Sequence, residues 1–199
     1  MFSKKILTLL IFLLISLSNI AKVYSIEPDI FIQSTVNRAA KTLGGNLSKE
    51  ERVEKLKEIA RDTVDIKGLG YYSLGSYKKN LSDKQLKEYE RVFEEYFLKS
   101  FSSRLAEYTD PKIHVDSQKK LNEKYTMVSS VLMATQEKPE VKINWRIVTK
   151  NPDKLLIIDV VIEGVSLAKV QKEEFNSIIQ NNDGNINALL ASLEEFVNK

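Results

Sequence analysis

The sequence contains no cysteine and only one histidine, His114, among its 199 residues. Without cysteine the chain can form no disulfide bond, no thiolate metal site and no Cys-His catalytic pair, and a single imidazole cannot supply a histidine cluster. His114 falls in a predicted strand at an edge of a sheet, where we interpret it as an ordinary surface or half-buried imidazole. We therefore expect neither a metal site nor a cofactor, and stability has to come from the apolar core.

Sequence patterns of nucleotide-binding and serine-hydrolase sites are also missing. No G-x-S-x-G, Walker or G-x-G-x-x-G pattern occurs. Asp159 and Glu163 are the only carboxylates in an otherwise apolar predicted strand, and because two carboxylates can act as acid and base in glycoside hydrolysis, a hydrolase is one alternative. The preferred interpretation is structural: Asp159 pairs with a neighbouring arginine or backbone group, and Glu163 reaches the turn amides beyond Gly164. The sequence thus predicts a protein that is not an enzyme.

The first 25 residues differ in composition from the rest of the chain. Lys4 and Lys5 precede an apolar run from Ile6 to Ile15, which is the basic and then hydrophobic order of a secretory signal peptide and is too short to span a bilayer. We predict a signal peptide over residues 1–25, cleaved after Ser25. An uncleaved anchor is the alternative, and a lipoprotein is excluded because no cysteine follows the run.

The excess of positive charge is small and lies in this N-terminal segment. The full chain has 30 basic and 27 acidic residues, and removal of residues 1–25 takes away three lysines and no acidic residue, which leaves 27 of each. A neutral mature chain argues against a reader of nucleic-acid backbones, because such a protein needs a concentrated basic patch. We expect no nucleic-acid partner.

The first half of the exported chain shows the apolar period of helices. Four helices are expected, of which the third is short and the fourth is about 27 residues long and aromatic along one side. Their expected boundaries are a stop at Gly44-Gly45, a capping box of Ser48 with Glu51, a short helix over Asp65 to Gly75, a capping box of Ser82 with Gln85, and a stop at Asp110-Pro111.

The second half changes from a period of 3.6 to a period of two. Strands are expected over Lys112–Val115, Tyr125–Thr135, Val141–Ile147 and Leu155–Ile162. Glu163-Gly164 then breaks the last strand, Ser166 caps a helix, and a second helix ends the chain. This order predicts an α+β fold with a four-stranded, mainly antiparallel, twisted sheet packed against several helices.

The junction from residue 158 to residue 167, with the sequence IDVVIEGVSL followed by Phe175, resembles the D-v-x-x-E-G-V-S signature of a periplasmic phospholipid-shuttle family. These are the MlaC-like, toluene-tolerance auxiliary components of lipid ABC transporters. Further resemblance lies in the segments 70–77 and 81–85 and in the positions Tyr89, Phe93, Tyr96, Leu105 and Tyr108. The chain departs from the family pattern where Lys172 replaces an arginine, and a tryptophan is absent just before Asp159.

The resemblance implies a soluble periplasmic carrier with one phospholipid-binding domain over residues 26–199. Such a carrier would pass lipid between an outer-membrane lipoprotein complex and an inner-membrane ABC transporter with its MCE-domain ring, and so maintain outer-membrane lipid asymmetry. The alternative within the same fold is a periplasmic adaptor module of the transporter that binds no lipid and has a solid core.

A carrier needs an apolar cavity between sheet and helices, which periodicity alone does not distinguish from a packed core. Gly68, Gly70 and Gly75 are candidates for a deformable mouth, since a glycine inside a helix costs about 1 kcal/mol relative to alanine. Replacing Gly70 with alanine is expected to slow lipid transfer at unchanged stability. The candidate pocket residues are Leu69, Tyr72, Leu74, Phe93, Phe97, Phe101, Met127, Val131, Met133, Ile143, Trp145, Ile147, Ile158, Val160 and Val165.

Overall fold

The computed structural model describes residues 26–136 and 138–199, so the expected signal peptide lies outside the described residues. The helices are α2 (Pro28–Leu43), α3 (Lys49–Thr63), α4 (Ile66–Leu74), the 3-10 helix η1 (Gly75–Asn80), α5 (Asp83–Leu105), α6 (Leu167–Gln180) and α7 (Ile186–Asn198). The strands are β1 (Ile113–Asn122), β2 (Tyr125–Leu132), β3 (Val141–Val148), β4 (Leu156–Ile162) and β5 (Val165–Ser166). The fold is therefore α+β, as the sequence predicts.

The strands form one antiparallel sheet in the order of the sequence, from β1 to β5. Four strands are those expected, and the fifth is a two-residue strand that follows the Glu163-Gly164 turn. Both turn residues have positive φ, 48° and 83°, which lets the chain reverse within two residues. The edge strand β5 consequently leads directly into α6.

The first strand is longer than expected. The sequence predicts Lys112–Val115, whereas β1 runs from Ile113 to Asn122 and pairs with β2 along its whole length. The additional residues lie on an edge strand, are all exposed and, apart from Leu121, are polar, so they show no apolar alternation. Bulges near Asp116 and Leu121 disturb the period further.

The helix boundaries follow the capping signals. Both predicted capping boxes are present, at Ser48 with Glu51 and at Ser82 with Gln85, and the Asp65 carboxylate accepts a hydrogen bond from the Gly68 amide at the start of α4. α5 ends at Leu105 and is 23 residues long, several residues shorter than expected. None of the helices described here has both the length and the apolar composition to cross a membrane.

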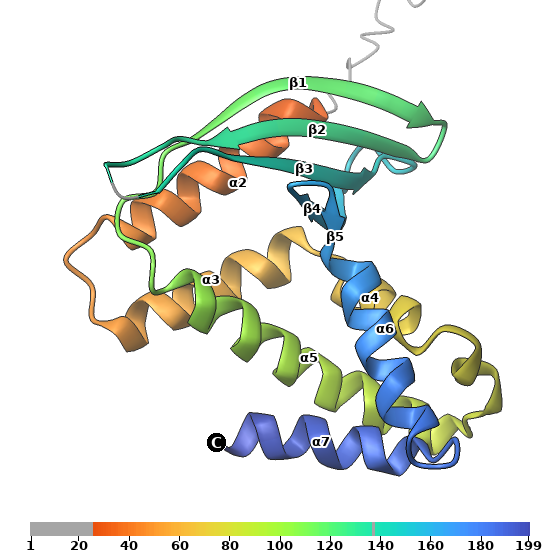
Figure 1. The fold of residues 1–199 in the computed structure, drawn as a ribbon. Helices are drawn as coiled ribbons and strands as arrows, with labels where there is room; N and C mark the ends of the chain where they lie inside the picture. Colours follow the sequence, from red (N-terminus) through yellow and green to blue (C-terminus); the bar gives the residue numbers. More distant parts are fainter. Residues whose placement is uncertain (1–25, 137) are drawn as a thin grey trace, which may run out of the picture.

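Figure 1 shows two layers, with the sheet and α2 above and with α4 to α7 below, while α3 rises from the lower layer toward the upper one. The buried side chains follow this division. One cluster, which we call the helical cluster, joins α4, α5, α6 and α7 around Tyr89, Phe93 and Phe175. A second, the sheet cluster, packs α2 against the inner face of the sheet around Ile32, Val128 and Ile147. A third, small cluster closes the end of α2 against α3 and α5.

Candidate functional site

The boundary between the two layers is lined by large apolar side chains that are only partly buried. Phe97 and Phe101 lie at the margin of the helical cluster, and Trp145 and Val160 lie at the margin of the sheet cluster. Val64 packs against both clusters. We call these five residues the seam. A compact domain normally has one contiguous core, whereas the described residues form separate helical and sheet clusters with partly buried aromatic rings at their margins.

Helix geometry orients α5 toward the seam. α7 covers the side of α5 that carries Arg91 and Lys99, which contact Glu194 and the Val197 carbonyl, and α3 covers the side that carries Glu94. Phe97 and Phe101 are partly buried on α5 and pack against the helical cluster. Their rings stack, with centroids 5.7 Å apart and planes 8° apart. The two seam residues of α5 thus form one stacked aromatic pair.

Trp145 forms the opposite wall and is held from the sheet side. Its indole Nε1 donates a hydrogen bond to Ser130 Oγ on the neighbouring strand at 2.8 Å, and this hydroxyl in turn donates to the Ile143 carbonyl at 3.2 Å. Because the polar atom of the indole is satisfied within the sheet, the rest of the ring presents an apolar surface. Ser130, itself 2% exposed, is a supporting residue that apolar patterning could not reveal.

The register divides the fifteen predicted pocket residues into groups. Phe97, Phe101, Trp145 and Val160 are the seam residues, Leu69 is partly buried against the helical cluster, and Ile143 is buried on β3. Leu74, Phe93 and Ile147 are buried inside the two clusters, and Ile158 occupies a bulge of β4. Tyr72 and Val165 are exposed, by 47% and 53%. Met127, Val131 and Met133 lie on the far face of the sheet.

One expectation was wrong, namely that Met127, Val131 and Met133 share a surface with Ile143, Trp145 and Ile147. In the observed register Val128 is opposite Trp145, while Met127 is opposite Arg146, so Met127 and Trp145 point to opposite faces. The inward side of β2 is Thr126, Val128 and Ser130, which is the more polar set. The sequence carries apolar residues at both parities of this strand, so alternation alone selects the wrong face.

Asp159 joins the sheet to α6. One carboxylate oxygen accepts hydrogen bonds from Ser166 Oγ at 2.7 Å and contacts Arg146 at 3.4 Å, and the other accepts from the Ala168 amide at 3.1 Å. Ser166 Oγ also accepts from the Lys169 amide. Two amides of the first turn of α6 are therefore satisfied by this pair of side chains. The structural interpretation of Asp159, with an arginine and a backbone partner, is confirmed.

Glu163 makes a different contact from the one expected. Its carboxylate accepts a hydrogen bond from the Lys142 amide on β3 at 2.5 Å, and does not reach the amides beyond Gly164. The prediction was wrong because Glu163 adopts a positive φ, which turns its side chain back across the ladder. Glu163 is exposed, while the Asp159 side chain is 2% exposed and already fully bonded. Both carboxylates make hydrogen bonds at the junction between the sheet and α6.

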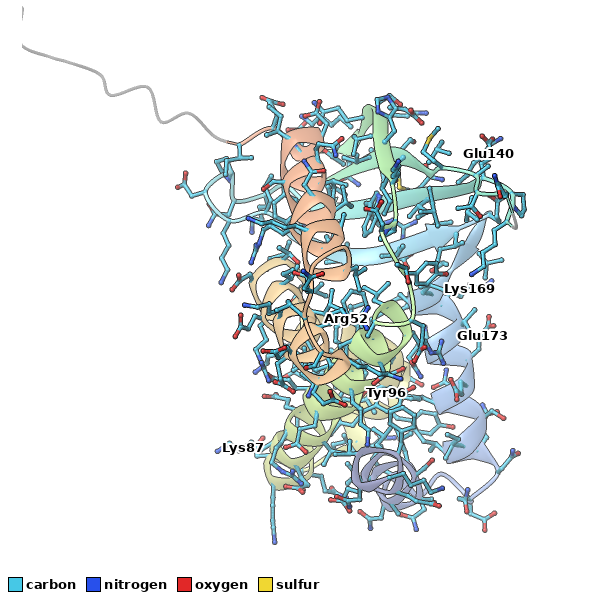
Figure 2. All side chains as sticks on the ribbon, turned by 90° about the vertical axis from the view of Figure 1, so that its left-hand side faces the viewer. Arg52, Lys87, Tyr96, Glu140, Lys169 and Glu173 are labelled. Carbon is cyan, nitrogen blue, oxygen red and sulfur yellow. The ribbon has the colours of Figure 1, made fainter. Side chains whose placement is uncertain are left out.

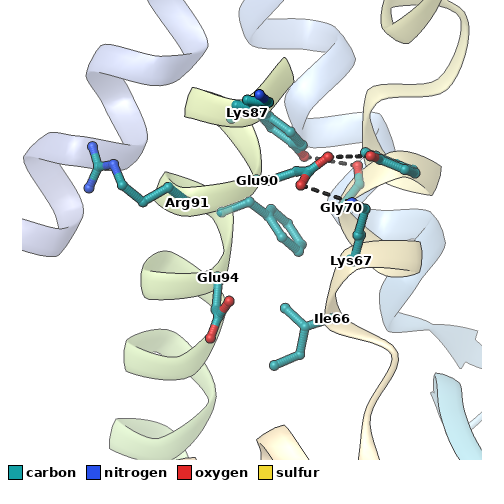
Figure 3. Close-up of a pocket in the computed structure, with 10 residues that line it drawn as sticks. Ile66, Lys67, Gly70, Lys87, Glu90, Arg91 and Glu94 are labelled. Atoms are coloured by element: carbon teal, nitrogen blue, oxygen red, sulfur yellow. Dashed lines mark hydrogen bonds and ion pairs between the residues drawn. The ribbon is translucent and has the colours of Figure 1, made fainter. Parts of the chain in front are cut away.

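A cleft of about 360 Å³ lies between α4 and α5, apart from the seam. It is lined mainly by charged and aromatic side chains, and Figure 3 shows the Glu90 carboxylate between Lys67 and the Tyr71 hydroxyl. The hydroxyl and the Lys67 ammonium hold the pKa of Glu90 below its usual value. Lys78 lies 3.5 Å from the Tyr71 ring centroid. Glu90 on α5 is thus bonded to Lys67 and Tyr71 on α4, and these contacts link the two helices across the cleft.

Metal-ligating side chains do not gather in the described part of the chain. No group of three or more His, Cys, Asp or Glu residues there has the arrangement of a metal site. His114 is a surface residue, with a side chain that is 72% exposed and lies 3.7 Å from Asp116. The interpretation of His114 as an ordinary imidazole is confirmed.

Comparison with protein families identifies the group to which this architecture belongs. The sequence model of the MlaC protein family matches residues 33–195. The chain belongs to the MlaC family. No curated protein matches it in sequence.

Among solved structures, the fold matches a phospholipid-binding protein from Ralstonia solanacearum that was determined in complex with a phospholipid. The TM-score is 0.73 at 15% sequence identity, over 86% of this chain and 97% of that one. The two chains therefore share the MlaC fold over almost their full length. The D-v-x-x-E-G-V-S signature of the family corresponds here to the junction built by Asp159, Glu163, Gly164 and Ser166.

Proposed function

We propose that this member of the MlaC family is a phospholipid carrier that holds acyl chains in the seam, in an apolar cavity between the sheet and the helices. The supporting observation is that the described structure has separate helical and sheet clusters, with Phe97 and Phe101 partly buried against the first and Trp145 and Val160 partly buried against the second. Family membership and the phospholipid complex of the structural neighbour agree with this assignment.

Simple energetics explains why lipid transfer across water needs such a protein. Each buried methylene contributes about 0.8 kcal/mol, so exposing two chains of about 16 carbons costs more than about 20 kcal/mol. Spontaneous desorption is correspondingly rare. A carrier has to offer the chains a surface nearly as apolar as the bilayer, and aromatic and aliphatic walls meet that requirement without covalent chemistry.

The wider role follows from the same family assignment. We propose that residues 26–199 form one lipid-binding domain that is exported by the 1–25 signal peptide, acts in the periplasm, and shuttles phospholipid between an outer-membrane lipoprotein complex and an inner-membrane MCE-domain ABC transporter. Outer-membrane lipid asymmetry would be the physiological result. The headgroup stays near solvent in this mechanism, and docking, partition of the tails and release make up the transfer cycle.

Filling the seam tests the carrier assignment. Val160→Trp adds an indole at the sheet wall and should reduce uptake of a fluorescent phospholipid from labelled vesicles by at least about tenfold, because the added ring competes with the acyl chains for the same volume. Val131→Trp adds the same ring on the far face of the sheet and should leave uptake unchanged. Equal effects of the two variants, at equal thermal stability, would contradict the placement of the tails in the seam.

A further inference from the structure

The six arginines of the chain fall into two classes in the described structure. Arg38, Arg61, Arg91 and Arg146 each pair with at least one carboxylate at 3.4 Å or less. Arg104, on the last turn of α5, makes no hydrogen bond or ion pair with any described residue, and Arg52 on α3 has a buried Nε without an acceptor. Figure 2 shows Arg52 at mid-height and Tyr96 lower, among the helices of the lower layer.

Arg104 continues the aromatic side of α5 toward solvent. Arg104 and Phe97 are seven residues apart, which is close to two full turns, so both side chains leave the helix on the same side and about 10 Å apart along the axis. Phe101 lies between them along the helix and stacks on Phe97. Since Arg104 is exposed, the guanidinium stands where the apolar wall of the seam meets water.

Polar groups surround this end of the seam. Side chains on a helix lean toward its N-terminus, so Arg104 reaches back along α5 toward Ser100 and Tyr96. The Arg104 charge opposes the rise in the pKa of Tyr96 that burial produces, which agrees with that direction. The Tyr96 hydroxyl donates to Gln171 on α6 at 3.1 Å. An unpaired cation thus lies near the Tyr96–Gln171 hydrogen bond, and the Glu174 carboxylate also acts on the Tyr96 hydroxyl.

A second cation, Lys138, lies near the segment that follows α5. Tyr108 is four residues beyond Arg104 along the chain, and Lys138 of the β2–β3 hairpin lies 5.3 Å from its ring centroid. The nearby carboxylate of Glu107 is paired with Lys49 at 2.6 Å, so it does not neutralise Arg104. Arg104 is therefore a cation without a carboxylate partner among the described residues, although the mature chain as a whole is neutral.

We propose that Arg104 binds the phosphate of the lipid headgroup while the acyl chains occupy the seam, an inference that rests on the proposed carrier function. A guanidinium can hold two phosphate oxygens at once and is always charged. The ligand class is an anionic phosphodiester carrying apolar chains, whatever alcohol is esterified to it. Arg104 therefore selects phospholipids as a class over neutral lipids with the same chains, and discriminates little among headgroups.

Loading measurements on the full mature chain test this assignment. Purified protein is offered vesicles containing a labelled phosphatidylglycerol, phosphatidylethanolamine or diacylglycerol with identical acyl chains. Arg104→Gln should lower uptake of both phospholipids about five- to tenfold and leave diacylglycerol uptake unchanged, since a partly exposed charged hydrogen bond is lost. Arg104→Lys should restore part of the loss. Arg38→Gln, which removes an exposed arginine of the upper layer, should change nothing.

Three results would overturn the proposal. Unchanged phospholipid uptake in Arg104→Gln would remove Arg104 from the site, and a parallel fall for diacylglycerol would reduce it to a structural residue. The wild-type protein should take up more phospholipid than diacylglycerol. If excess inorganic phosphate abolished this difference in uptake, Arg104 would be a site for free phosphate. Absence of any lipid uptake by the wild-type protein would contradict the carrier function itself. If only the phosphate contact is wrong, the wild-type protein still takes up diacylglycerol, so the diacylglycerol measurement distinguishes the two failures.

Discussion

Asp159 is a buried carboxylate in a strand whose other side chains are apolar. Burying such a charge is unfavourable unless hydrogen bonds replace its hydration, and here Ser166, Ala168 and Arg146 supply them. The result is a fixed angle between β4 and α6. Since α6 belongs to the lower layer and β4 to the upper one, a single side chain helps to set the separation of the two walls of the seam.

Replacement of Asp159 by asparagine should therefore act on folding. Asn keeps the shape but has only one acceptor oxygen, which leaves a buried amide or hydroxyl unpaired, and we expect a loss of about 2–4 kcal/mol in the free energy of unfolding. Urea denaturation followed by circular dichroism measures this loss. Glu163→Gln is the control, because an exposed side chain that retains an acceptor for the Lys142 amide should cost less than about 1 kcal/mol. Equal midpoints for wild type and Asp159→Asn would contradict this account.

Gly70 is a point of close approach between α4 and α5. The sequence predicts a deformable mouth and a Gly70→Ala variant of unchanged stability, whereas a Cβ at this position would lie 2.8 Å from Phe93 Cδ1. Gly70 also accepts a hydrogen bond from the buried Tyr89 hydroxyl through its carbonyl. The glycine is required because α4 and α5 approach closely inside the helical cluster.

Gly70→Ala should consequently destabilise the protein by about 1–2 kcal/mol, with the strain against Phe93 exceeding the gain in helix propensity. Thermal and urea unfolding report the change. Gly44→Ala provides the comparison, because Gly44 has φ of −83° and a Cβ there would come no closer than 3.4 Å to its neighbours, so its effect should stay within about 0.5 kcal/mol. A stable Gly70→Ala variant with slow lipid transfer would instead restore the original hypothesis of a mouth.

At the level of elements, helices could be predicted well because their signals are local. Ser48, Ser82 and Ser166 cap the helices that follow them, as their sequence spacing indicates. The strands carry less local information. β1 was predicted too short because an exposed edge needs no apolar side chains, and the facing side of β2 was predicted wrongly because its inward residues include Thr126 and Ser130, which are buried through tertiary contacts.

The link between α4 and α5 makes stability depend on pH. The Tyr71 hydroxyl and Lys67 lower the pKa of Glu90 in the folded state, so this ionised carboxylate stabilises the fold at pH values above its ordinary pKa of 4.5. That contribution is lost as the pH falls through the lowered value. Between about pH 5 and about pH 3 the urea midpoint of the wild type should therefore fall more steeply than that of Glu90→Gln.

The matched control for this pH dependence is Glu58→Gln on α3, since Glu58 is exposed and makes no ion pair with the described residues. Its midpoint should follow the wild-type curve. If Glu90→Gln also followed that curve, the contacts of Glu90 with Tyr71 and Lys67 would contribute nothing to the stability of the fold.

At the scale of the whole molecule, the two-layer arrangement is what distinguishes this chain from a domain with one core. The family assignment and the α+β architecture could be predicted from the junction signature and the order of helices and strands. The composition of the seam could not, because it combines a helix side and a sheet face whose register only the tertiary structure defines. Trp145 and Phe97 illustrate this, because both are half-buried members of the seam but they belong to opposite layers.

The most direct test of the carrier function is native mass spectrometry, combined with organic extraction, of residues 26–199 exported in a bacterial host and purified without detergent. We expect a stoichiometric adduct with the mass of a phospholipid, and the extracted lipid would show how many acyl chains the protein holds. A clean apo mass, together with no uptake from labelled vesicles, would contradict the carrier function and assign the protein as an adaptor module with a packed core.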